Sequence, residues 1–413
     1  MGAMRLLGAV LLAGLLVCGG VARAAEDPVI TFGMSAAFTG PSRGLGIELY
    51  RGASACFEQV NAKGGVHGRK LGITALDDGY NPLPTIANTI QFIERDDVFA
   101  LFSYVGTPTV TRILPLLLKY RDRHVYLLFP FTGAEPHRSE PYSEFVFNLR
   151  ASYMQETEAV VDRLIALGRT RVGIFYQADA YGRGGWDGVR RALAKYGLKP
   201  VADVSYPRGS GTEYSYTEQA RLLHEADIDA VVCIGTYASG AGFIRDLRDM
   251  GNTALAASVS FADGDNLIRL LVEMGGAAGV DYTADLVHMQ VVPCYEDLGL
   301  PAVRAYRAAM DSYSGVLPAH LGKESYLPKR YSAVSFEGYM NARLIVEMLR
   351  RMGANPDKSK IPRVLESMAD LDVGLDMPVS FGPDRHQGLD RVYFMMLSGG
   401  RHVPVADWER WRR

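Results

Sequence analysis

A run of small, hydroxyl-bearing residues, "SYVGTPTV" at 103–110, lies between two apolar segments. The segment before it, "VFALF", has the length and composition of a buried strand, and the segment after it, "TRILPLLLKY", has those of a helix. Gly106 lets the backbone approach a ligand closely, and the hydroxyls of Thr107 and Thr109 can join free N–H groups at the helix start to bind an anion. Thr109 is also the expected cap of that helix. The loop is therefore either a carboxylate site or an ordinary capped turn.

A second loop has the same design. "FPFTGAE" at 129–135 directly follows the apolar segment "VYLLF" and places Phe131, Thr132 and Gly133 at its centre. In an open parallel sheet, ligands bind beyond the carboxyl ends of the strands, where loops lead into helices. Two polar loops at neighbouring strand ends therefore predict one shared site.

Patterns for nucleotide binding or catalysis are missing from the sequence. No Walker pattern, G-x-G-x-x-G or G-x-S-x-G accompanies these loops, and Ser103 has no identifiable His–Asp partners. The eight histidines are scattered, and the cysteines include no C-x-x-C pair. We expect a protein without catalytic residues, metal or cofactor, and nothing local specifies a disulfide.

Length and charge narrow the class of protein further. The chain has 413 residues, enough for two ordinary domains, with 48% hydrophobic and 22% charged residues, as in a globular protein. The formal net charge of -2 gives no electrostatic reason to expect nucleic acid as a partner.

The N-terminus has the order of a secretory signal peptide, assigned to residues 1–24. Arg5 precedes an apolar run from Leu6 to Val17, and Ala22 and Ala24 form an Ala-x-Ala site. The run is shorter than the roughly 20 residues of a spanning helix, so we expect cleavage after Ala24 or Ala25 and a mature protein that does not span the membrane. The alternatives are an uncleaved anchor and a lipid on Cys18, for which the preceding Val17 is a poor fit.

Strand-like and helix-like segments alternate along the rest of the chain, and the alternation starts again near residue 171. Such alternation predicts βαβ units, and the restart predicts two doubly wound, Rossmann-like α/β lobes. A long helix is expected at about 332–352, and the C-terminal segment 377–405 reads as two strands. The expected strands are 29–34, 70–77, 98–104, 125–129, 171–176, 200–206, 230–235, 255–261 and 288–293.

Several motifs, in order, resemble one known family: "GMSAAFTGPSRGLG", "VNAKGGVHGRKLGI", "LDDGYNP", "YVGTPT", "FPFTGAE", "FYQADAYG" and "VSFEGY". They are similar to the periplasmic solute-binding proteins of ABC transporters, in the branch typified by the leucine/isoleucine/valine-binding proteins. The resemblance runs from about Val29 to the C-terminus. It implies the type I periplasmic-binding fold and a periplasmic location. It also implies the capture of a small solute for a membrane permease, and we expect the protein to be a monomer.

The resemblance also implies a domain organisation and a site. Lobe one would comprise 27–148 plus 293–353, lobe two 149–292 plus 354–413, joined by a three-crossing hinge. The two loops above would bind the ligand carboxylate, and tyrosines of lobe two would close over it. The expected ligand-binding residues are Ser103, Tyr104, Gly106, Thr107, Thr109, Phe131, Thr132, Gly133, Tyr181, Tyr237, Phe261 and Asp263.

One departure from the family leaves the ligand class open. The family's amino-acid binders offer the ligand ammonium an acid from a loop that here falls near Ser260 and Phe261, and neither residue is acidic. Asp263 is the nearest acid, offset by two residues. Because an ammonium buried without a counter-charge costs several kcal/mol, the ligand is either an amino acid or related carboxylate, or an apolar, lipid-like solute. A ligand sensor of the same fold is a further alternative to transport.

Overall fold

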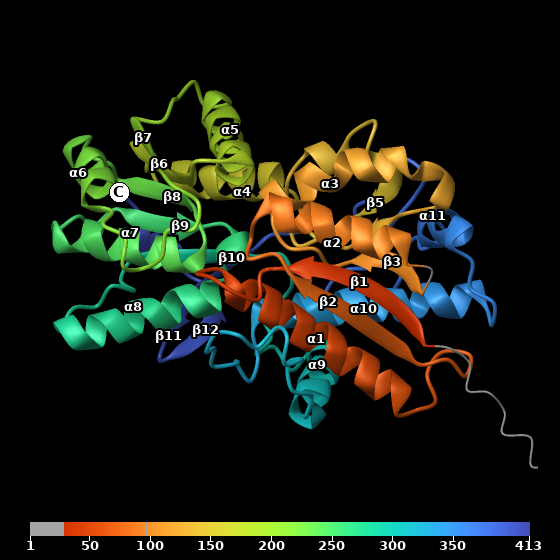
Figure 1. Cartoon of the computed structure of the whole chain (residues 1–413). Coiled ribbons are helices and arrows are strands. Elements are labelled where there is room, and N and C mark those ends of the chain that lie inside the picture. The colour runs from red at the N-terminus through yellow and green to blue at the C-terminus, as the bar shows by residue number, and fades with distance from the viewer. Residues whose placement is uncertain (1–28, 96) are drawn as a thin grey trace, which may run out of the picture.

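The computed structural model describes residues 29–95 and 97–413, and the expected signal peptide at 1–24, with Cys18, lies outside the described residues. The described chain forms two α/β lobes that lie side by side, each built on its own sheet (Figure 1). Within the described residues, no helix is both long and apolar enough to cross a membrane. The predicted fold class, two Rossmann-like lobes, is confirmed.

The first lobe contains a parallel five-stranded sheet in the order β2-β1-β3-β4-β5. Its strands are β1 (Ile30–Ala36), β2 (Leu71–Asp77), β3 (Val98–Phe102), β4 (Leu127–Leu128) and β5 (Val146–Phe147). Its helices are α1 (Arg43–Asn61), α2 (Pro82–Glu94), α3 (Thr107–Lys119), α9 (Pro301–Ser312), α10 (Ala333–Met352) and α11 (Ile361–Glu366). Strand order reverses between β1 and β3, which is where open sheets of this kind bind ligands.

The second lobe contains a seven-stranded sheet in the order β12-β11-β10-β9-β8-β6-β7. Its strands are β6 (Val172–Gln177), β7 (Ala202–Tyr206), β8 (Ala230–Ile234), β9 (Leu255–Ser258), β10 (Leu286–Gln290), β11 (Tyr393–Ser398) and β12 (Arg401–Pro404). Its helices are α4 (Tyr153–Ala166), α5 (Ala180–Ala194), α6 (Thr217–Glu225), α7 (Tyr237–Asp249) and α8 (Gly264–Ala278). Strands β6 to β10 are parallel, and the C-terminal hairpin β11–β12 extends the sheet antiparallel.

Local sequence explains why these elements form where they do. The central strand β8, "AVVCI", is apolar throughout and fully buried, as expected for a parallel strand covered on both faces. Helix α4 begins at a capping box, in which Ser152 and Gln155 each bind the other's backbone N–H. Helix α10 is capped by Ser332 and begins within one residue of its predicted start.

The chain passes between the lobes three times. It leaves the first sheet after β5, returns after β10, and enters the second sheet again at β11. The first and last passages run side by side, because the Asn148 N–H donates to the His386 carbonyl at 2.7 Å and the Gly388 N–H to the Asn148 carbonyl at 2.8 Å. These backbone hydrogen bonds align the two connections that a hinge motion would bend.

The C-terminal segment departs from the expected division at 353. Ile361, Leu365 and Phe381 are buried in the same apolar core as Phe129 and Phe147 of the first lobe. Their burial against the first sheet assigns 361–389 to lobe one, so the expectation that all of 354–413 joins lobe two is corrected for this part. Only the hairpin from Tyr393 onward adds to the second sheet. We propose that the third crossing lies at 390–392.

Helices α1 and α10 cross in the first lobe at a contact close enough to require glycine. A Cβ on Gly52 would lie 1.8 Å from the Ser335 carbonyl oxygen, and one on Gly338 would lie 2.2 Å from the Leu49 carbonyl oxygen. Both obstacles are backbone atoms, which cannot move aside as a side chain can. This contact fixes α10, which carries Glu337 and Asn341 toward the ends of the strands.

We predict that Gly52→Ala destabilises the protein by at least about 2 kcal/mol, because overpacking a close helix contact outweighs any gain in helix propensity. Denaturant unfolding followed by circular dichroism measures the change. Gly276→Ala in α8 is the matched control, since a Cβ there meets nothing within 4 Å. It should leave stability unchanged or raise it by up to about 1 kcal/mol. Equal stability of the two variants would contradict the close contact.

Candidate ligand-binding cleft

The two lobes meet through the loops at the carboxyl ends of their strands. The Gly44 N–H at the start of α1 donates to the Tyr237 hydroxyl at 3.0 Å, and the Gln177 side chain donates to the Tyr80 hydroxyl at 3.3 Å. Both hydrogen bonds join lobe one to lobe two. The lobes are therefore closed against each other, with the cleft side chains buried between them.

The loop 103–110 lies in this cleft, with a backbone that differs from the expected one. Helix α3 begins at Thr107, two residues before the expected cap, and Gly106 precedes it with a φ of 107°. A Cβ on Gly106 would lie 2.3 Å from the Tyr80 ring, so glycine is required here. The Thr109 hydroxyl donates to the carbonyls of Val105 and Gly106 inside the first turn. The prediction that Thr109 caps α3 is wrong, and its hydroxyl is occupied by the helix itself.

Ser103 and Tyr104 contact the first lobe rather than the second. The Ser103 hydroxyl accepts a hydrogen bond from Asn341 on α10 at 3.1 Å, and the Tyr104 hydroxyl pairs with Thr89 on α2, also at 3.1 Å. Both side chains are fully buried, and Tyr104 belongs to the apolar core of lobe one. Both side chains therefore hold the loop against helices α10 and α2 of lobe one.

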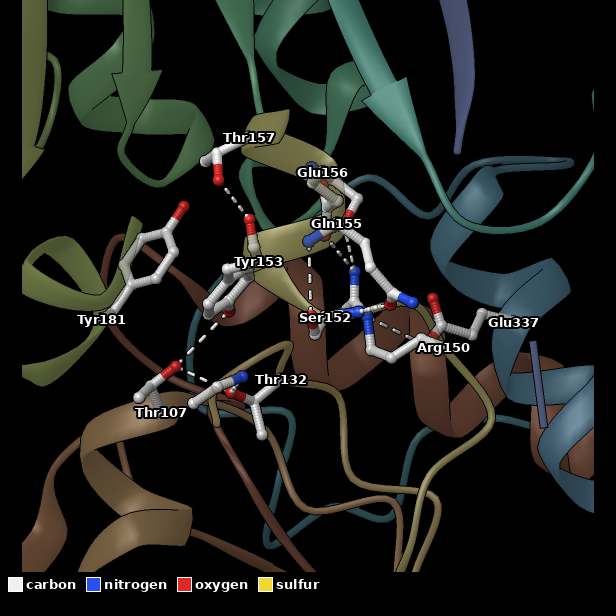
Figure 2. Close-up of polar contacts among 12 residues, drawn as sticks. Thr107, Thr132, Arg150, Ser152, Tyr153, Gln155, Glu156, Thr157, Tyr181 and Glu337 are labelled. Carbon is white, nitrogen blue, oxygen red and sulfur yellow. Dashed lines mark hydrogen bonds and ion pairs between the residues drawn. The ribbon is translucent and has the colours of Figure 1, made fainter. Parts of the chain in front are cut away.

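Three hydroxyls meet at the centre of the cleft (Figure 2). Those of Thr107 and Thr132 are 2.7 Å apart, and the Tyr153 hydroxyl lies 3.4 Å from that of Thr107. Gly133 lets Tyr153 approach, because a Cβ there would come within 2.7 Å of its ring, and the Tyr153 N–H donates to the Gly133 carbonyl. Because one of the Thr107 and Thr132 hydroxyls donates its proton to the other, the cluster can offer its remaining hydroxyl protons to one small polar group.

Aromatic rings from both lobes surround this hydroxyl cluster. The Phe261 ring of lobe two lies 5.8 Å from Tyr80 and 5.5 Å from Phe131 of lobe one, and 4.7 Å from Tyr181. The Tyr181 ring lies 5.3 Å from the Tyr153 ring. The Tyr181 hydroxyl donates to the Gly235 carbonyl. The five rings make the cleft wall mostly apolar.

A buried arginine occupies the first crossing between the lobes. Arg150 is fully buried, its guanidinium lies 4.3 Å from the centre of the Phe131 ring, and its Nη2 donates to the Ser260 hydroxyl. Its Nε and Nη1 have no hydrogen-bond partner among the described residues. The single Nε–H and the two Nη1–H groups therefore make no hydrogen bond among these residues, although Nε lies 3.7 Å from the Glu337 carboxylate.

Two buried glutamates flank this arginine from opposite lobes (Figure 2). Glu156 on α4 lies 4.0 Å from Arg150 and accepts two hydrogen bonds from Ser260, through its N–H and its hydroxyl. Glu337 on α10 lies 3.7 Å from the Arg150 Nε. Burial raises the pKa of both carboxyls, that of Glu337 to about 7, while the charge of Arg150 opposes the shift.

The remaining expected residues contact the other lobe or their own helix. Tyr237 binds the start of α1 through its hydroxyl, as described above. Asp263 caps α8, accepting from the Asn266 N–H at 3.2 Å and from its side-chain amide at 2.6 Å. Burial and the charge of Asp265 raise the pKa of Asp263. Its carboxylate is thus occupied by the helix it begins.

A small cavity of about 10 Å³ lies beside Arg150, lined in part by Phe131, Ser260, Gln290 and Glu337. Larger hollows of about 320 and 660 Å³ lie elsewhere, beside Cys56 and beside His386. No group of three or more potential metal ligands occurs among the described residues. The three described cysteines, Cys56, Cys233 and Cys294, are buried and unpaired.

Sequence reasoning missed the charged residues of the cleft. Arg150 stands alone in the uncharged run "VFNLRASYMQ", and Glu337 stands alone in "YSAVSFEGYMNA". A lone charge inside an otherwise uncharged segment is a usable signal, since charged side chains are rarely buried without a partner. Tyr80 and Tyr153, also missed, carry no such signal, because tyrosines are common throughout this chain.

Comparisons with known proteins identify the family. A family model described as periplasmic binding protein matches residues 29–401. The amino acid binding protein of Pseudomonas aeruginosa is 25% identical over 226 residues, 54% of this chain and 59% of that protein. A Leu/Ile/Val-binding protein homolog of Brucella melitensis is 24% identical over 387 residues, 91% of this chain and 90% of that protein. The matches to the first two curated relatives span only about three fifths of those proteins.

Solved structures agree with this assignment. The crystal structure of a possible leucine/isoleucine/valine-binding protein from Rhodopirellula baltica superposes with a TM-score of 0.82 at 31% identity, covering 94% of this chain and 99% of that one. The resemblance to the leucine/isoleucine/valine-binding branch is confirmed by these relatives. The chain belongs to the periplasmic binding protein family, whose members bind solutes and are not enzymes.

Proposed function

We propose that this protein is exported, with cleavage after Ala24 or Ala25, and captures a small ligand in the cleft for an ABC-type permease. The favoured ligand is an amino acid or a related carboxylate. The protein acts as a monomer in the periplasm and closes its lobes by bending the three connections. A closed form of this kind is the shape that a membrane permease would recognise.

The observation that carries the proposal is the hydroxyl cluster of Thr107, Thr132 and Tyr153 beside the unpaired N–H groups of Arg150. Hydroxyl and guanidinium donors converging in a buried site suit an anionic group, and hydrogen bonds to a charged group are the strong ones. The names of the relatives, amino acid binding and Leu/Ile/Val-binding, agree with a carboxylate ligand.

A second candidate is an apolar or lipid-like solute, favoured by the aromatic wall. The rings of Tyr80, Phe131, Tyr153, Tyr181 and Phe261 supply a large apolar surface that does not depend on ligand charge. Under this alternative, affinity would depend on the rings and hardly on the hydroxyls. A sensing role would use the same cleft with a receptor in place of a permease.

Mass spectrometry of the denatured, purified protein should release a small carboxylate in about equimolar amount. The physical reason is that a ligand enclosed by two closed lobes dissociates slowly and survives purification. Intact-mass measurement of periplasmic material checks export in the same sample, and should give a chain starting at Ala25 or Glu26. Release of a neutral lipid alone would favour the second candidate.

Replacing either cleft threonine should weaken binding of that carboxylate by roughly 10- to 150-fold, the loss of about 1.5–3 kcal/mol for one hydrogen bond to a charged group. Thr107→Val and Thr132→Val keep the side-chain shape and remove the hydroxyl, and titration calorimetry measures the affinity. Thr109→Val is the matched control, because that hydroxyl bonds its own helix. Affinities within twofold of wild type for both cleft variants would refute the hydroxyl cluster as the anion site.

Removing the Tyr237 hydroxyl should weaken ligand binding by about 2- to 13-fold without changing ligand preference. The Tyr237→Phe variant lacks the acceptor for the Gly44 N–H and so loses a contact made only when the lobes meet. Tyr216→Phe is the control, since the Tyr216 hydroxyl donates to the Gly211 carbonyl within lobe two. An equal effect of both substitutions would show that the loss comes from general destabilisation, not from closure.

A further inference from the structure

Glu337 is a buried carboxylate without a hydrogen bond. Its side chain is 4% exposed, yet no N–H or O–H of the described residues donates to it, and the nearest cation, the Arg150 Nε, is 3.7 Å away. Glu156, on the other side of the same arginine, differs by receiving two hydrogen bonds from Ser260. A buried carboxylate that lacks donors costs several kcal/mol, so Glu337 is the one of the two that calls for a further donor.

The cavity beside Glu337 limits the size of that donor. It measures about 10 Å³, close to the room taken by one water-sized group. Gln290 also lines this cavity, and its Nε2 has no hydrogen-bond partner among the described residues. An amide can present either its nitrogen or its oxygen after a half-turn of the side chain. Two side chains from different lobes thus line one small space, Glu337 with an ion pair to Arg150 but no hydrogen bond, and Gln290 with an amide nitrogen that makes none.

We propose that Glu337 binds the primary ammonium group of the ligand, and that it supplies from lobe one the counter-charge missing at Ser260 and Phe261 in lobe two. An ammonium is compact, matches the size of the cavity and carries three donors, which a carboxylate without hydrogen bonds can accept. The inference rests on the proposed function and narrows its ligand class to solutes that carry an amine as well as a carboxylate.

Asp263, the acid that lies nearest in sequence to the expected ammonium position, instead caps helix α8. Both oxygens of Asp263 are engaged by Asn266 at the start of α8, so a ligand would have to displace a helix cap to reach them. Glu337 has no such competing partner. Burial raises its pKa to about 7, which is the behaviour of a carboxyl whose charge is only partly compensated by Arg150.

The test uses the full mature protein, stripped of bound ligand by unfolding and refolding. Thermal shift with the twenty L-amino acids identifies one that binds, and calorimetry then compares it with the same molecule lacking the amine. The wild type should bind the amino acid at least tenfold more tightly than the deaminated acid. Glu337→Gln should weaken amino-acid binding at least tenfold and leave the deaminated acid unaffected.

Two further variants separate recognition from folding. Glu347→Gln makes the same substitution on the same helix, where Glu347 pairs with Arg351 at the surface, and should bind like wild type. Glu337→Asp keeps the charge and should bind the amino acid more tightly than Glu337→Gln. Equal binding of the amino acid and its deaminated form overturns the inference, as does Glu337→Gln binding within threefold of wild type. In either case a carboxylate still binds and the proposed function stands, whereas failure of all twenty amino acids and of their deaminated forms to bind refutes both the inference and the favoured ligand class.

Discussion

The Arg150 guanidinium, buried in the first crossing between the lobes, constrains the rest of the cleft. Removing a guanidinium from water costs several kcal/mol unless partners replace the lost hydration. Its partners come from both sides: the Phe131 ring and Glu337 from lobe one, Ser260 and Glu156 from lobe two. Separation of the lobes would remove part of this set. Pairing of Arg150 and closure of the cleft are therefore coupled.

The two lobes are rigid enough for this coupling to matter. In lobe one, the glycine contact between α1 and α10 fixes the position of α10, which carries Glu337. Asn341 on the same helix donates a hydrogen bond to Ser103 in the cleft loop. In lobe two, Glu156 orients Ser260 through two hydrogen bonds. Closure thus brings together two prearranged halves of one site, with the flexibility confined to the three connections.

The periodicity of the sequence predicted most of the fold, because each expected strand segment overlaps a strand of the structure. The two-residue strand β5 was missed, since so short an element has no period. The tail 361–389 was misassigned because its apolar residues, such as Ile361 and Phe381, do not reveal which of two cores buries them. A threonine before an apolar run is typical of a helix cap and predicts one at Thr109, but the cap is Gly106, with a φ of 107°, three residues earlier.

The candidate site was predictable only where chemistry is local. The loops around Thr107 and Thr132 were identified because hydroxyls after an apolar strand form a local pattern. The pairing of Arg150 with Glu337 joins segments far apart in the chain, and no spacing rule connects them. Their meeting depends on the packing of α10 against the first crossing, which only the three-dimensional structure provides.

The most direct test of coupled closure is small-angle X-ray scattering of the stripped protein before and after its own released ligand is returned. The hydroxyl cluster and the charged groups around Arg150 come from both lobes. If one bound ligand contacts all of them, the radius of gyration should fall on binding, with one ligand per chain. An unchanged radius of gyration at saturating ligand would show that binding does not close the lobes and would contradict the coupling of ligand binding to closure.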